Sequence, residues 1–318
     1  MDYTQIVILM ITGLISGTLF TWLIIPVLKK MHTGQNIREE GPSSHMTKSG
    51  TPTMGGIAFI AATVLTCVIA DVMSTELLII LAAFIMFGVL GFVDDYLKVV
   101  KKHNLGLRAW QKLVFQIAIG VFLAVYQSST SIFGTTVRIP VINEFWDFGL
   151  LYVPFIAFVI VAMVNSVNLT DGLDGLAAGA TSIIALFFAI TGTMFHLTEG
   201  ANFCAALTGA CLGFLVFNKN PAKVFMGDTG SLALGGGLAA AAIVMNMELL
   251  LPIVGFIYVA ESLSVIIQVI SFKSTGKRVF KMSPLHHHFE LSGMSERQVV
   301  MMFWAVTLVL CILGLQLV

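Results

Sequence analysis

The feature that most constrains the fold is a series of apolar runs long enough to cross a lipid bilayer as helices. Roughly 20 residues suffice for one crossing, and the backbone must satisfy its own hydrogen bonds in lipid, which favours helices. With 57% hydrophobic and only 11% charged residues, the chain has too little polar surface for a soluble fold. We predict an all-α, polytopic integral membrane protein. Ten runs are expected, over 5–28, 52–70, 76–93, 112–128, 150–168, 176–194, 201–217, 230–247, 249–271 and 298–317.

The basic residues predict how the chain is oriented. Of the 17 Lys and Arg, 16 fall in the loops after odd-numbered runs, and only Arg138 lies elsewhere. Basic residues favour the cytoplasmic side, so both termini are expected outside. The outer loop 129–149 alternates apolar residues at Val137, Ile139 and Val141, which predicts a short hairpin.

Paired carboxylates mark the end of the third run. Neighbouring side chains on a helix point about 100° apart, so Asp94 and Asp95 are expected to have different roles. Lys98 is within reach of this pair on a continuing helix. A simple salt bridge at an exposed helix end is the alternative interpretation.

A second polar cluster, NSVNLTDGLDGL, follows the fifth run. Its oxygen-bearing side chains recur every third residue, at Asn165, Asn168, Asp171 and Asp174. Such oxygens are hard ligands that suit Mg²⁺, while an Asx-rich turn that caps the next helix is the alternative. Gly172 allows the backbone to turn or to approach a ligand closely.

Two further segments carry polar groups on the same expected face. Asp228, in FMGDTGS, lies just before the eighth run. The start of a helix suits a phosphate or an anionic metal ligand. The alternative is that Asp228 only caps the helix. Phe225 and Asn218 offer a stacking face and a polar edge, although packing is an alternative role for Phe225. The run His286, His287 and His288 can bind phosphate, shuttle protons or ligate a metal.

Taken together, these motifs resemble those of the polyprenyl-phosphate N-acetylhexosamine-1-phosphate transferase family, over essentially the whole length. The resemblance rests on KSGTPTMGG at 48–56, GFVDDYLK at 91–98, NLTDGLDGL at 168–176, FMGDTGSLALGG at 225–236 and PLHHHFE at 284–290. The last motif resembles the muramoyl-pentapeptide branch of the family.

The resemblance implies a single transmembrane transferase domain over 1–318 in a bacterial inner membrane, with the active site on the cytoplasmic face. The implied reaction is Mg²⁺-dependent. It moves phospho-MurNAc-pentapeptide from UDP-MurNAc-pentapeptide to undecaprenyl phosphate and releases UMP. The implied partners are these substrates and membrane lipids, with a homodimer as the assembly and no nucleic acid.

The resemblance also implies roles for individual residues. Asp228 would ligate Mg²⁺ with Asp171 and Asn168 close by, and Asp94, supported by Asp95, would deprotonate or position the lipid phosphate. His287 would act in catalysis and, with His288, contact the phosphate–sugar portion. The remaining substrate-binding residues would be Lys48, Thr53, Lys98, Lys112, Gly172, Asp174, Asn218, Phe225, Gly227, Gln268 and His286.

Two other functions remain open from the sequence. A relative that transfers GlcNAc-1-phosphate would share most of the motifs, although PLHHHFE at 284–290 favours the muramoyl branch. A cation-coupled transporter would need ionisable groups in the middle of its spans. Only Glu261, in the ninth run, fits that requirement.

Overall fold

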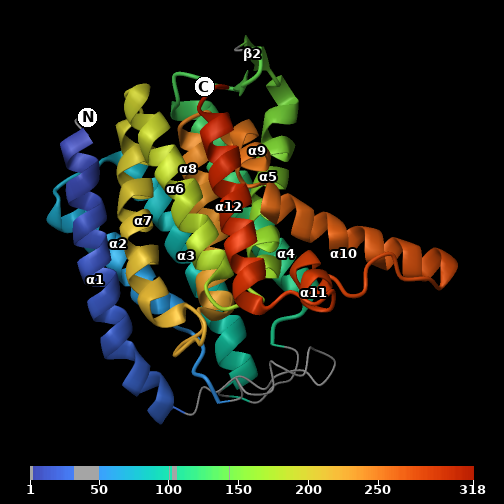
Figure 1. Cartoon of the computed structure of the whole chain (residues 1–318). Coiled ribbons are helices and arrows are strands. Elements are labelled where there is room, and N and C mark those ends of the chain that lie inside the picture. Colours follow the sequence, from blue (N-terminus) through green and yellow to red (C-terminus); the bar gives the residue numbers. More distant parts are fainter. Residues whose placement is uncertain (1–2, 32–49, 100, 102–105, 143) are drawn as a thin grey trace.

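The computed structural model describes residues 3–31, 50–99, 101, 106–142 and 144–318, and it is almost entirely helical (Figure 1). Among these residues, nine helices are long and apolar enough to span a membrane. They are α1 (Tyr3–Lys30), α3 (Thr75–Val99), α4 (Ala109–Thr130), α5 (Tyr152–Thr170), α6 (Leu176–Met194), α7 (Thr198–Asn218), α8 (Gly227–Val244), α10 (Phe256–Thr275) and α12 (Glu296–Gly314). The shorter apolar helix α2 (Gly56–Ile69) brings the described apolar helices to the expected ten. The predicted fold class is confirmed.

Helices rich in small residues form the centre of the bundle. The helices α6, α7 and α8 are largely buried, whereas α1 and α10 expose most of their apolar side chains. On α8, a side chain at Gly236 or Gly237 would collide with the rings of Phe87 and Phe84 on α3. The glycines therefore let α8 and α3 approach closely, as small residues do between membrane helices.

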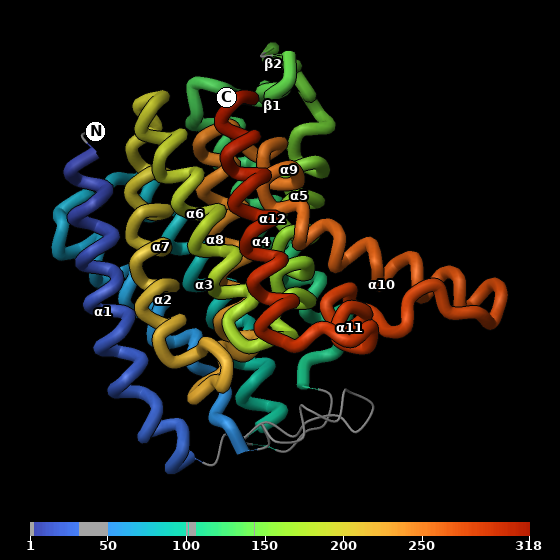
Figure 2. The backbone as a smooth tube through the Cα atoms, viewed as in Figure 1, coloured from blue at the N-terminus to red at the C-terminus, as the bar shows by residue number. Residues whose placement is uncertain are grey.

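The expected span over 249–271 is wrong as a single helix. The chain forms a 3₁₀ turn, η3 (Glu248–Leu250), then one turn of α-helix, α9 (Leu251–Val254), and bends at Gly255 before α10 begins. Figure 2 shows α10 leaving the bundle sideways as a projecting arm. The apolar run is continuous across the bend, so hydropathy could not reveal it.

A small sheet covers one end of the bundle. The strands β1 (Thr136–Ile139) and β2 (Glu144–Asp147) pair antiparallel, with Val137 opposite Trp146. This confirms the predicted hairpin. Asn246 holds it to the bundle, because its amide accepts the Arg138 N–H at 3.0 Å and donates to the Thr136 carbonyl at 3.1 Å. The start of α1 and the end of α12 lie at this same end (Figure 1).

Candidate active site

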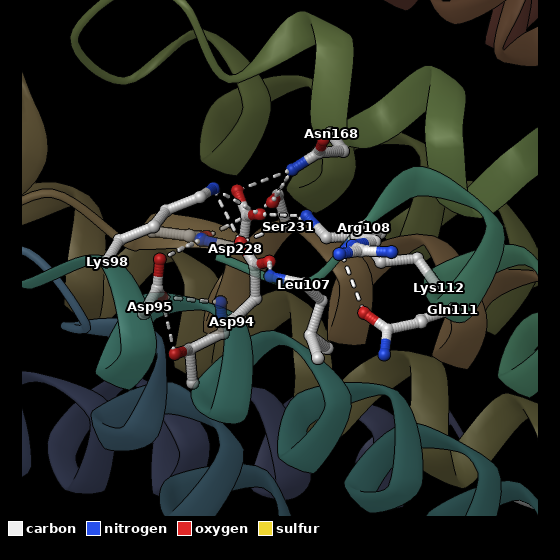
Figure 3. Close-up of polar contacts among 12 residues, drawn as sticks. Asp94, Asp95, Lys98, Leu107, Arg108, Gln111, Lys112, Asn168, Asp228 and Ser231 are labelled. Carbon is white, nitrogen blue, oxygen red and sulfur yellow. Dashed lines mark hydrogen bonds and ion pairs between the residues drawn. The ribbon is translucent and has the colours of Figure 1, made fainter. Parts of the chain in front are cut away.

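Three carboxylates gather at the opposite end of the bundle, where α3 ends and α8 begins (Figure 3). Asp94 and Asp95 come from the last two turns of α3, and Asp228 from the first turn of α8. Among the described residues, one oxygen from each lies within 4.8 Å of the others. Asp94 and Asp95 are buried and Asp228 is partly accessible. The predicted convergence of these motifs is therefore present.

Asp95 fixes the start of α8. Its carboxylate accepts the N–H of Asp228 at 3.1 Å, and the N–H and hydroxyl of Thr229 at 2.8 and 2.7 Å. These N–H groups have no partner within the helix, and their positive partial charge favours a carboxylate. Asp95 thus holds Asp228 in place, while Asp94 makes different contacts, as the sequence predicted for neighbouring residues.

Asp94 and Asp228 share two lysine side chains. The Lys98 Nζ lies 2.5 Å from Asp94 Oδ2 and 3.0 Å from Asp228 Oδ2. The Lys112 Nζ, from α4, lies 3.0 and 2.7 Å from the same two oxygens. Both lysines reach Asp228 with hydrogen-bond geometry, whereas Asp94 Oδ2 is held by charge and distance alone. The N–H of Leu107 also donates to Asp94 Oδ1 at 2.8 Å.

The predicted Asn and Asp stripe after 164 divides among different partners. Asn168 reaches the acidic cluster, because its amide donates to Asp228 Oδ1 at 3.0 Å and to the Ser231 hydroxyl at 2.8 Å. Asn165 instead donates to Gln116 at 2.8 Å. The stripe therefore does not converge on one point.

Asp171 follows α5 as its C-cap residue, which accords with the alternative of a turn. Burial, and then the negative charges of Asp228, Asp95 and Asp174, raise the pKa of the Asp171 carboxyl well above its ordinary value. A cation near the cluster would relieve this repulsion.

Asp174 joins three segments of the chain. Its carboxylate accepts the Ala222 N–H at 3.0 Å and the Asn220 amide at 3.2 Å, and its own N–H donates to Glu296 at 2.8 Å. Glu296 also accepts from Asn220 at 2.8 Å. The sequence analysis did not predict a role for Glu296 or Asn220. The only signal for them was their position among polar residues, after α7 for Asn220 and at the start of α12 for Glu296.

Asn218 is the last residue of α7, and Phe225 lies in the loop that follows this helix. The Asn218 amide accepts the Gly175 N–H at 3.1 Å and donates to the Val224 carbonyl at 2.9 Å. The half-buried Phe225 pairs its backbone with Pro52 and Gly55 at 2.8 and 2.9 Å. The loop after α7 is therefore fixed to the segment before α2.

The three histidines lie on the short helix α11 (Leu285–Glu290) and face different surroundings. His286 is buried, and its ring packs against Gly172, where a Cβ would collide with it. The ring of His287 contacts the Glu290 carboxylate at 2.9 Å. His288 accepts the Lys281 N–H at 3.2 Å.

Glu261, the residue that suggested a transporter, accepts the backbone N–H groups of Leu285 and His286 at 2.7 and 3.2 Å. It is fully buried. Glu261 therefore anchors the start of α11 to α10.

The other predicted residues have mixed placements. Thr53 is buried beside Gly227, whose φ of +71° suits glycine; a Cβ there would lie 2.7 Å from the Thr53 hydroxyl. The Gln268 side chain accepts hydrogen bonds from the N–H groups of Val279 and Phe280 and donates one to the Phe280 carbonyl, at 2.9–3.0 Å. Lys48 lies outside the described residues.

The chemistry of the donor set fits a divalent cation. Carboxylate oxygens are ligands that hard cations prefer, and Asp94, Asp95 and Asp228 supply them at one point, while the Asn168 amide turns its nitrogen towards Asp228. Two lysines beside them can contact phosphate oxygens. A cluster of this kind at one end of membrane helices defines a membrane enzyme of phosphate chemistry.

Comparison with known proteins agrees with this class. The model of glycosyl transferase family 4 matches residues 77–246, and signature 1 of the phospho-N-acetylmuramoyl-pentapeptide-transferases matches residues 48–60. A phospho-N-acetylmuramoyl-pentapeptide-transferase of Alkaliphilus metalliredigens is 56% identical over 99% of this chain and 98% of its own. Proteins of the same name from a Thermoanaerobacter species and from Heliobacterium modesticaldum are 53% and 49% identical, over 95% of this chain and 94% and 93% of theirs. The chain therefore belongs to glycosyl transferase family 4 and, within it, to the phospho-N-acetylmuramoyl-pentapeptide-transferases.

Proposed function

We propose that the protein transfers phospho-MurNAc-pentapeptide from UDP-MurNAc-pentapeptide to undecaprenyl phosphate, which releases UMP and forms lipid I for peptidoglycan synthesis. The single observation that carries the proposal is the Asp94, Asp95 and Asp228 cluster with its two lysines. It occurs in a chain whose relatives bear the name of this activity over their full length.

The reaction exchanges one phosphoanhydride for another, so catalysis consists mainly of aligning two anionic phosphates and offsetting their repulsion. An oxygen of the lipid phosphate attacks the sugar-linked phosphorus, the bond from that phosphorus to the UMP oxygen breaks, and UMP leaves. Asp94 positions the lipid phosphate and accepts its proton where it carries one. Lys98 and Lys112 contact the phosphate oxygens, which they can reach from their places beside Asp228.

We assign Mg²⁺ to Asp228, with Asn168 and Asp171 near it. When bound, the ion would neutralise charge on the diphosphate. Asp95 acts through Asp228, because its carboxylate holds the N–H groups at the start of α8.

The remaining assignments concern the uridine and the phosphate–sugar portion of the substrate. The uridine moiety would be held by Lys48, Asp174, Asn218, Phe225 and Gly172, and Thr53, Gly227 and Gln268 would also bind substrate. The phosphate–sugar portion would contact His287 and His288, while the buried His286 supports Gly172. We further propose that this end of the bundle faces the cytoplasm across the inner membrane, with both termini outside, and that the protein is a homodimer.

The test is a reconstituted assay with detergent-purified protein. UMP release is expected only when UDP-MurNAc-pentapeptide, undecaprenyl phosphate and Mg²⁺ are all present. Substituting UDP-GlcNAc should abolish release. Release from UDP-GlcNAc at an equal rate would contradict the assignment of the sugar, and release without the lipid would contradict transfer.

A further inference from the structure

Two ammonium groups lie where a divalent cation would approach the acidic cluster. The Nζ atoms of Lys98 and Lys112 both contact Asp94 Oδ2 and Asp228 Oδ2, at 2.5–3.0 Å (Figure 3). A carboxylate oxygen has two lone pairs for such contacts. The position that bridges Asp94 and Asp228 is therefore filled by the protein's own cations.

The remaining oxygens of these carboxylates are partly engaged as well. Asp228 Oδ1 accepts the Asn168 amide at 3.0 Å, and Asp94 Oδ1 accepts the Leu107 N–H at 2.8 Å. Mg²⁺ binds oxygen at about 2.0–2.1 Å, which is closer than an ammonium group. An ion that binds Asp228 through Oδ2 must therefore move at least one lysine, while Asp94 holds the same two lysines in place.

The charges at this point also balance without a metal. Two carboxylates and two ammonium groups sum to zero, and the Asp95 charge is stabilised separately by the start of α8. The Asp94 side chain is fully buried and that of Lys112 is 19% exposed, so water screens their attraction little. A divalent cation alone gains less from such a neutral group than from two free carboxylates.

We propose that Lys98 and Lys112, held by Asp94, compete with the divalent cation for Asp228, and that the diphosphate of the nucleotide relieves this competition by drawing the lysines onto its oxygens. The lysines thus have two alternative partners, and metal and nucleotide bind cooperatively. This inference rests on the proposed function, because it takes the diphosphate nucleotide as the ligand. Each partner must then raise the affinity for the other by the same factor.

The experiment measures binding of Mn²⁺ to the purified full-length protein in detergent, by electron paramagnetic resonance. Without nucleotide, Lys98→Met and Lys112→Met should each bind Mn²⁺ more tightly than the wild type, by roughly tenfold or more. Lys101→Met is the matched control. It removes one exposed charge just after α3, the helix that carries Lys98. It should leave Mn²⁺ affinity within about twofold, since exposed charges are screened.

A second arm adds uridine diphosphate as the probe. It should tighten Mn²⁺ binding strongly in the wild type and much less in the two lysine variants, because the competition is already gone. Equal or weaker Mn²⁺ binding by both variants would overturn the proposal. The variants Lys98→Gln and Lys112→Gln repeat the measurement if a Met variant fails to fold.

The outcomes separate this inference from the proposed function. Normal transfer by the wild type, with Mn²⁺ affinity insensitive to both lysines, would overturn the inference alone. Tighter Mn²⁺ binding by the variants, with no transfer by the wild type from UDP-MurNAc-pentapeptide, would support the lysine competition and contradict the proposed substrate.

Discussion

The backbone of Gly91 on α3 lies directly against the carbonyl group of Asp228 on α8. A Cβ at Gly91 would overlap that carbonyl and lie 2.6 Å from the Thr229 nitrogen. The contact is one turn before Asp94 and Asp95, so it sets the distance over which Asp95 reaches the start of α8. A glycine that itself carries no functional group thus controls the geometry of the carboxylates.

Gly91→Ala should therefore damage the site by displacing the backbone of Asp228. The methyl group must push α8 away from α3, at a cost of about 1–3 kcal/mol in stability. Because small displacements of reacting groups are costly, transfer should fall by roughly 10²-fold. Gly88→Ala is the control, since the nearest atom to its Cβ would be the flexible end of Ile60 at 2.8 Å, with Ala233 and Thr229 at ordinary van der Waals distance. Equal activity of both variants in the UMP-release assay would show that the contact does not position Asp228.

Removing the charge of Asp228 should abolish metal-dependent transfer. Asp228→Asn keeps the shape of the side chain but loses the attraction for a cation and for Lys98 and Lys112. Transfer should fall by roughly 10²–10³-fold, the scale of losing one electrostatic contact in an active site. Mn²⁺ titration of the variant should show weakened binding. Mg²⁺-dependent transfer at the wild-type rate would remove Asp228 from the metal site.

Gly172 and His286 should be coupled in stability. In Gly172→Ala the new methyl group collides with the buried imidazole, so unfolding in detergent should become easier by about 1–3 kcal/mol. In a His286→Ala background the same change should cost much less, because the ring is gone. A thermal-unfolding cycle of the four proteins measures this coupling. Strictly additive effects would mean that the two residues do not constrain each other.

Glu248, at the hairpin end, should make stability depend on pH. Burial raises the pKa of this carboxyl to about 8, because Glu248 is only 2% exposed. In the unfolded chain the pKa is about 4.3, so stability is lost as pH rises from there towards 8 and stays low above it. By linkage, the loss is on the order of 5 kcal/mol.

Glu248→Gln tests this dependence, because the amide cannot ionise. The variant should become progressively more stable than the wild type between about pH 5 and pH 8 in thermal unfolding. Glu144→Gln, at an exposed position of β2, is the control and should follow the wild type. A constant difference across this pH range would contradict an ionisable Glu248 in the folded interior.

Much of the fold was predictable because the bilayer imposes a simple rule on the sequence. The run 176–194 was predicted with the same bounds as α6, since Asp174 and Gly175 precede its apolar residues and His196 follows them closely. The bend at Gly255 was not predictable, because the residues on both sides are equally apolar. The direction that a helix takes depends on how it packs against its neighbours, and hydropathy carries no information about that packing.

The acidic cluster was predictable in membership but not in its contacts. The distribution of Lys and Arg predicted that Asp94, Asp95 and Asp228 lie on the same side of the membrane. The structure brings one oxygen of each within 4.8 Å of the others. That Asp95 holds the start of α8, and that Lys112 reaches Asp228, depends on contacts between residues 134 and 116 positions apart. The substrate roles of His287, His288 and Gln268 stay predictions, and the hydrogen bonds of Gln268 favour a role in shaping the loop after α10.

The pairing of Lys98 with Asp228 spans 130 positions of the chain. During synthesis, α3 emerges and enters the bilayer long before its acidic partner exists. A chain arrested before α8 therefore carries both lysines and two aspartates but no reaction centre. Interrupted products should be inert, and a cell gains no partial activity until nearly three quarters of the polypeptide has been made.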